Sequence, residues 1–128
     1  MRAPKTPTTP AKIVWEGDSL DVLKEFPKTV KTDLGAQLWL LQSGELPKDF
    51  KKMNGVGSGV FELREQDASH WYRVIYLSKV GDTIYVLHSF KKKSGKTSKQ
   101  DIETAKQRLK KVSERITKRG KNENKKDD

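Results

Sequence analysis

The stretch VFELREQDASHWYRVIYLSKVGDTIYVLHSF, residues 60–90, decides the fold of this chain. It contains three runs rich in β-branched and aromatic residues, at 60–64, 71–78 and 83–90, and a short Gly-Asp loop joins the last two runs. Runs of this composition, separated by turn residues, are typical of β-strands that pair with their neighbours along the chain. We therefore predict an antiparallel meander of three strands.

Helices are predicted on both sides of this meander. Before it, a short strand at 12–16 and a helix that ends at Pro27 precede a second helix at 29–42. The apolar face of that second helix consists of Val30, Leu34, Leu38 and Leu41. After the meander, Thr97 or Ser98 can cap a last helix. Its apolar residues recur every three or four positions and are Ile102, Ala105, Leu109, Val112 and Ile116.

The predicted class is α+β, in the order β-α-α-β-β-β-α. A helical hairpin would cover one face of an antiparallel sheet of about four strands and leave the other face free for a ligand. With 128 residues, 33% of them apolar, the chain is long enough for one domain, expected at 12–117. Residues 1–11, which are basic, and 118–128, which are charged, have no apolar residues to anchor them and are expected to be disordered tails.

Composition argues against several classes of protein. The chain has no cysteine and two histidines, so neither a disulfide framework nor a zinc site is expected. Residues 1–10 lack the apolar core of a signal peptide, and no run reaches membrane-spanning length. We expect a soluble, cytoplasmic protein without a membrane partner.

The positive charge of the chain is local. The formal net charge is +10, yet residues 13–90 carry nine Lys or Arg against eleven Asp or Glu, whereas residues 91–116 carry ten against three. One interpretation of the basic segment is a solvated lysine-rich helix. The uneven distribution of charge along the chain favours a second interpretation, a surface that binds a polyanion.

Strand alternation assigns side chains to the two faces of the sheet. Phe61 and Leu63 are predicted to face the helices, and so are Tyr72, Val74 and Tyr76. Alternation then leaves Glu62, Arg64 and Arg73 on the free face. The two arginines could instead form surface ion pairs with neighbouring carboxylates, namely Glu62, Glu65 or Asp67.

The third strand runs into a basic cluster with features of a phosphate site. Lys91, Lys92, Lys93 and Lys96 repel one another unless an anion lies between them, and the start of the last helix adds free amides. Phe90, Tyr72 or Trp71 could stack a base, although packing in the core is the alternative for each. His88 could carry a proton, or be a strand histidine held by a hydrogen bond.

The carboxylates are too scattered for a metal-dependent nuclease. RNA can be cleaved without a metal, because a base can activate the 2′-hydroxyl for attack on the adjacent phosphorus. Cations then stabilise the added charge, and an acid protonates the leaving oxygen. Lysines could act as the base and arginines could hold the phosphate.

The chain from residue 60 onward resembles the RelE/HigB-type bacterial toxins, in the branch of phage-derived host-killing proteins. The matching features are Glu62-Leu63-Arg64, Tyr72-Arg73-Val74-Ile75-Tyr76, the segment VLHSFKKKSGKT at 86–97, and the pattern from Asp101-Ile102 through Ala105 to Arg108. Ser98 stands where the branch commonly has proline, a change of little consequence at a helix start.

The resemblance implies a RelE-like fold and the toxin of a type II toxin-antitoxin system. Such a toxin is an mRNA endonuclease, often ribosome-dependent, that uses no metal or small-molecule cofactor, and its antitoxin carries a helix-turn-helix domain. Carried onto this chain, the resemblance implies catalytic residues Arg64, Arg73, His88, Lys92 and Lys93. It implies RNA contacts from Phe90, Lys91 and Lys96, and Tyr72 is added to them as an aromatic ring that could stack a base.

Two other functions remain open from the sequence. The same superfamily contains ParE-like proteins that inhibit gyrase without catalysis. A nucleic-acid-binding module that only follows phosphates is the third hypothesis.

Overall fold

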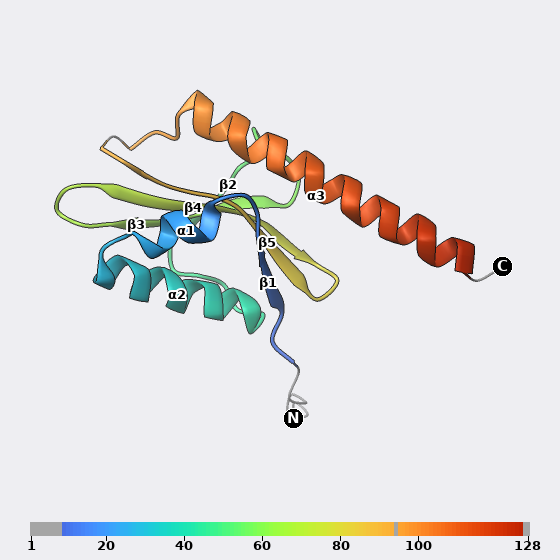
Figure 1. The fold of residues 1–128 in the computed structure, drawn as a ribbon. Coiled ribbons are helices and arrows are strands. Elements are labelled where there is room, and N and C mark those ends of the chain that lie inside the picture. The colour runs from blue at the N-terminus through green and yellow to red at the C-terminus, as the bar shows by residue number, and fades with distance from the viewer. Residues whose placement is uncertain (1–8, 94, 127–128) are drawn as a thin grey trace.

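The computed structural model describes residues 9–93 and 95–126, which form a five-stranded sheet with helices on both faces (Figure 1). The elements in chain order are β1 (Lys12–Trp15), α1 (Ser19–Lys24), α2 (Lys28–Gln42), β2 (Phe50–Lys52), β3 (Val60–Gln66), β4 (Trp71–Val80), β5 (Thr83–Lys92) and α3 (Lys99–Lys126). The predicted α+β class is confirmed, and the arrangement is consistent with a RelE-like fold.

The sheet has the order β1-β5-β4-β3-β2, with one more strand than predicted. The pairs β2·β3, β3·β4 and β4·β5 are antiparallel, as expected of a meander, but β1 pairs with β5 in parallel. The predicted antiparallel pairing therefore holds for every pair except that of β1 with β5. The extra strand, β2, has three residues, too few for an alternation of apolar and polar side chains to be recognised in the sequence. It is held by pairing with β3, and Phe50 packs edge-on against Phe61 at 6.0 Å.

The first face of the sheet packs against α1 and α2, as the alternation predicted. Leu63, Val74 and Tyr76 are buried there against Leu34 and Leu38 of α2. Burial of this apolar surface supplies the main stabilisation of the hairpin on the sheet. The predicted face assignment is therefore confirmed.

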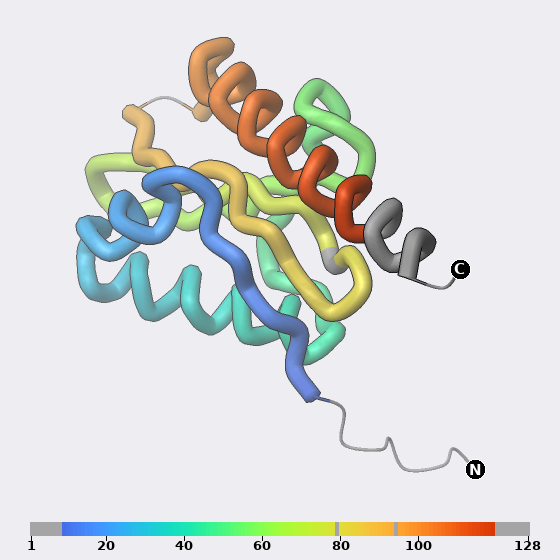
Figure 2. Tube along the Cα trace, turned by 45° about the vertical axis from the view of Figure 1, so that its right-hand side comes forward, coloured from blue at the N-terminus to red at the C-terminus, as the bar shows by residue number. Residues whose placement is uncertain are grey.

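The second face is covered by α3, which corrects the prediction of a free face. Figures 1 and 2 show α3 lying across the sheet on the side opposite α1 and α2. Ala105 and Val112 of α3 are fully buried, in one apolar cluster with Ile75 and Leu87 of the sheet. The apolar stripe of this helix was recognised in the sequence, but an isolated stripe does not say which surface it covers.

The chain ends also differ from expectation. Ala11 is buried and its amide donates to the Gln42 carbonyl at 2.9 Å, so it belongs to the domain and not to a tail. The helix α3 continues to Lys126, where a disordered tail was predicted from residue 118. Residues 1–8 and 127–128, also predicted to be disordered, lie outside the described residues. In the part of the chain that is described, no helix is long and apolar enough to cross a membrane.

Candidate functional site

A bulge in β5 directs His88 toward α3. Ile75 of β4 pairs with His88, but the next residue, Tyr76, pairs with Val86, so Leu87 has no partner in the register. An extra residue of this kind lets two consecutive side chains face the same side of a sheet. Leu87 therefore packs under α3, and His88 also contacts α3. Simple alternation from Val86, which lies in the hairpin core, would have turned His88 to the other face.

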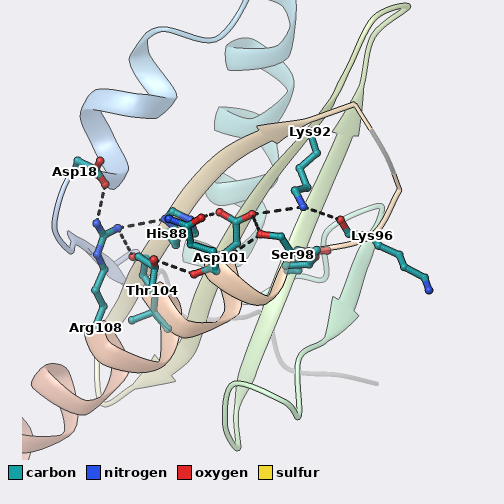
Figure 3. Close-up of polar contacts among 12 residues, drawn as sticks. Asp18, His88, Lys92, Lys96, Ser98, Asp101, Thr104 and Arg108 are labelled. Carbon is teal, nitrogen blue, oxygen red and sulfur yellow. Dashed lines mark hydrogen bonds and ion pairs between the residues drawn. The ribbon is translucent and has the colours of Figure 1, made fainter.

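Both ring nitrogens of His88 are engaged within the protein (Figure 3). Nε2 lies 2.8 Å from Asp101 Oδ1, and Nδ1 lies 3.4 Å from Arg108 Nη1. Arginine can only donate, so Nδ1 is the acceptor and Nε2 carries the hydrogen that is donated to Asp101. The ring stacks on Phe90 at 4.9 Å and the side chain is 12% exposed. His88 is thus held in one tautomer and orientation.

Asp101, in the first turn of α3, joins several side chains of the predicted site. It accepts a hydrogen bond from Ser98 Oγ at 2.6 Å and lies 3.7 Å from Lys92 Nζ. Burial acts to raise the pKa of Asp101, but the hydrogen bonds from Ser98 and His88 and the charge of Lys92 outweigh it and lower the pKa. The carboxylate therefore stays charged and neutralises Lys92, whose ammonium also donates to the Lys96 carbonyl at 3.1 Å.

Two further contacts complete what we call the Asp101 network, the set of Asp101, His88, Lys92, Ser98 and Arg108. Ser98 Oγ accepts a hydrogen bond from the Asp101 amide at 3.1 Å, which identifies Ser98 as the N-cap of α3. Arg108 donates to Asp18, in the loop before α1, at 2.8 Å. The network thereby joins α3, β5 and the start of α1.

Arg73 lies in a buried triad with Glu62 and Thr97. Its Nη1 donates to Glu62 Oε1 at 2.7 Å and to Thr97 Oγ1 at 3.2 Å, while Thr97 donates to Glu62 Oε2 at 2.7 Å. Its Nη2 donates to the Gly95 carbonyl. The Arg73 and Glu62 side chains are 3% and 0% exposed, so this is not the surface pair considered from the sequence. The triad fastens the segment 95–97 to the sheet.

Arg64 lies opposite Arg73 in the β3–β4 register, on the same face as predicted. Its environment differs, because it is half-buried and pairs with Asp49 at 3.1 Å instead of with Glu62, Glu65 or Asp67. Lys48, Trp71 and Arg64 line a shallow pocket of about 340 Å³ at this edge. Trp71 also stands beside the Arg73 guanidinium, 5.4 Å from ring centroid to Cζ.

The remaining predicted residues divide between the two faces. Tyr72 is buried against Phe26 of the helical hairpin, and Lys91, its partner in the β4–β5 register, lines a small pocket together with Val22 and Phe26. Phe90 is 7% exposed in the core under α3. Lys93 and Lys96 are exposed, and among the described side chains neither has an ion-pair partner.

The structure therefore brings together only part of the predicted set. The residues on the α3 side are Arg64, Arg73, His88, Phe90, Lys92 and Lys96, whereas Tyr72 and Lys91 lie on the hairpin side. Lys93 lies just beyond the end of β5. Sequence reasoning missed Thr97, Asp101 and Arg108 as polar partners of this site. The spacing of Ser98 and Asp101, typical of a helix cap, was the one available signal.

Within residues 9–93 and 95–126, no group of three or more acidic or histidine side chains could hold a metal ion. Residues 21–110, well over half of the chain, match the family model described as "Phage derived protein Gp49-like (DUF891)". No curated protein matches the chain.

Proposed function

Since this chain belongs to the Gp49-like family of phage-derived proteins, which are toxins of the addiction-module kind, we propose that it is an RNA endonuclease that blocks translation. The family implies a cognate antitoxin. We further propose that the target is mRNA, that cleavage takes place on the ribosome and needs no metal, and that the antitoxin carries a helix-turn-helix domain.

The observation that carries this proposal is the set of exposed ammonium groups where β5 ends. Lys93 and Lys96 have no carboxylate partner among the described side chains, whereas nearby Lys92 and Arg108 are paired with Asp101 and Asp18. Unpaired cations are stabilised by an anion that binds beside them. An RNA backbone supplies phosphates at regular intervals, and binding releases its counterions.

The proposed reaction uses the substrate's own nucleophile. A base removes the proton of a 2′-hydroxyl, the oxygen attacks the adjacent phosphorus, and the leaving 5′-oxygen takes a proton, which yields a 2′,3′-cyclic phosphate and a 5′-hydroxyl. In our proposal Lys92 or Lys93 takes part in proton transfer, and Lys96 contacts the backbone. The added negative charge is stabilised by these cations, by Arg64 and, at its one uncommitted nitrogen, by Arg73.

His88 would be the second proton carrier, and the Asp101 network supports a defined role for it. A carboxylate that accepts a hydrogen bond from one ring nitrogen fixes the tautomer and the orientation of the ring. The other nitrogen contacts Arg108 at 3.4 Å, a long bond that a substrate oxygen could replace. We therefore assign proton transfer with the RNA to Nδ1 and orientation of the ring to Asp101.

The proposal is tested with purified toxin, translating ribosomes and a defined mRNA. The double variant Lys93→Ala/Lys96→Ala should lower the cleavage rate by at least about tenfold, because hydrogen bonds to charged groups are lost. The matched control is Lys24→Ala/Lys28→Ala, which removes two exposed lysines of α1 and α2. If the wild-type protein arrests growth while mRNA on translating ribosomes stays intact, the nuclease proposal is wrong.

A second candidate is nucleic-acid binding without cleavage. It is favoured by the internal engagement of both His88 nitrogens and of both terminal nitrogens of Arg73. It predicts a steep salt dependence of affinity and small, similar losses from each lysine. A Lys92→Ala protein that binds RNA normally but no longer arrests growth would exclude it. A gyrase supercoiling assay tests the ParE-like alternative in the same samples.

A further inference from the structure

A pocket of about 300 Å³ opens beside the buried triad, between β2, the segment 95–97 and the start of α3. It lies at the lower end of the size range of small-ligand sites. The residues that line it include Lys51, Met53, Arg73, Lys96, Thr97 and Ile102. None of Lys51, Met53 or Ile102 was singled out from the sequence as a site residue.

The lining is divided into apolar and cationic parts. Met53 is buried and Ile102 half-buried, and their side chains offer a surface on which a flat ring can pack. Lys51 and Lys96 are exposed, with no ion-pair partner among the described side chains. An inorganic anion would use only the cations, whereas a nucleotide would use both parts.

Arg73 adds a polar group that lacks a partner. Its Nη1 and Nη2 donate hydrogen bonds to Glu62 and to the Gly95 carbonyl. Nε has no hydrogen-bond partner among the described residues, although the side chain is only 3% exposed. A buried donor without an acceptor is unfavourable, because it has lost its hydrogen bonds to water. A ligand with an acceptor atom would therefore gain from binding here.

We propose that this pocket takes one nucleotide of the RNA, with its base against Met53 and Ile102 and its phosphate between Lys51 and Lys96. An acceptor of that nucleotide receives the Arg73 Nε–H. The inference rests on the proposed function and deepens it, because a pocket for a single base makes cleavage depend on the base that occupies it. Arg73 is then both the positioning residue of the segment 95–97 and a ligand contact.

Gly95 offers a clean way to obstruct the pocket. It lines the cavity, its φ is not in the left-handed region, and a Cβ added there would meet no atom within 4 Å. Gly95→Leu should therefore fold normally while its side chain occupies ligand space. The matched control is Gly35→Leu on the exposed side of α2, where an added Cβ also meets open space. Lys51→Ala, at an exposed position, is a second test variant.

The probe is a 2′-O-methyl RNA hexamer, which cannot be cleaved through the 2′-oxygen, together with six versions that each lack one base. Affinities are measured by calorimetry with the full chain. We expect one abasic position to weaken binding by about tenfold or more, the typical contribution of a packed base. Gly95→Leu should bind the intact hexamer as weakly as wild type binds that abasic version, Lys51→Ala should bind severalfold more weakly, and Gly35→Leu should match wild type.

The outcomes separate this inference from the nuclease proposal. If the hexamer binds but all abasic versions bind alike, or if Gly95→Leu binds as wild type does, the pocket is not a nucleotide site, whatever the cleavage assay on ribosomes shows. Absence of binding to the hexamer overturns the inference too. Intact mRNA in the ribosome assay, with the abasic effect present, would refute cleavage and leave the nucleotide site standing.

Discussion

Replacing Glu62 by alanine should be among the most destabilising single changes in this protein. Glu62 is fully buried and accepts hydrogen bonds from both Arg73 and Thr97, each at 2.7 Å. Its removal leaves the Arg73 guanidinium buried without a counter-charge, which costs about 3–5 kcal/mol. Total stability is typically about 5–15 kcal/mol, so the variant should be close to unfolding.

The assay is urea denaturation followed by circular dichroism. With a slope of about 2 kcal/mol per molar urea, the Glu62→Ala midpoint should fall by about 2 M. The comparison is Asp49→Ala, which breaks the exposed pair with Arg64 and should lower stability by at most about 1 kcal/mol. The double variant Glu62→Leu/Arg73→Leu should recover much of the loss, because no charge is then buried alone.

Equal midpoint shifts for Glu62→Ala and Asp49→Ala would refute this reasoning, because they would mean that burial adds nothing to the importance of the Arg73 pair. The double variant gives an independent criterion. If it is no more stable than Glu62→Ala, the loss comes from the missing contacts and not from an uncompensated charge.

Three further predictions concern the junction of α3 with the rest of the domain. Folding lowers the pKa of Asp101 from its ordinary value of 3.8, so the charged carboxylate stabilises the fold above that pH. The melting temperature of wild type should therefore exceed that of Asp101→Asn, and this difference should shrink as the pH falls below 3.8. Gly17 has φ +54°, and a Cβ there would overlap the Arg108 guanidinium, so Gly17→Ala should lower the free energy of unfolding by at least about 1 kcal/mol; an unchanged urea midpoint would contradict this. Val112 is fully buried, and Val112→Ala should lower the free energy of unfolding by about 2 kcal/mol. Ser113→Ala, on the exposed side of the helix, should have no measurable effect on it.

Local patterns were enough to predict most of the elements. The alternation of Phe61 and Leu63 in β3, and of Tyr72, Val74 and Tyr76 in β4, correctly identified the face that packs against the hairpin, because a strand's side-chain period does not depend on its partners. The periodicity of α2 and α3 likewise indicated helices with one apolar face. These properties are set by neighbours a few residues apart.

Tertiary contacts decided which residues form the site. The packing of α3 on the predicted free face buried Arg73 with Glu62 and Thr97, and it brought Asp101 to His88. These partners come from different elements, so no spacing along the chain shows that they meet.

The sequence by itself determined that a cluster of lysines lies at the end of the last strand, because charge and strand pattern are both local properties. Only the tertiary structure decided that Lys92 is neutralised by Asp101 while Lys93 and Lys96 remain exposed. It also decided, through the bulge at Leu87, that His88 faces α3. The physical reason is that register and helix packing depend on the surface that the whole chain buries together, which a short segment does not contain.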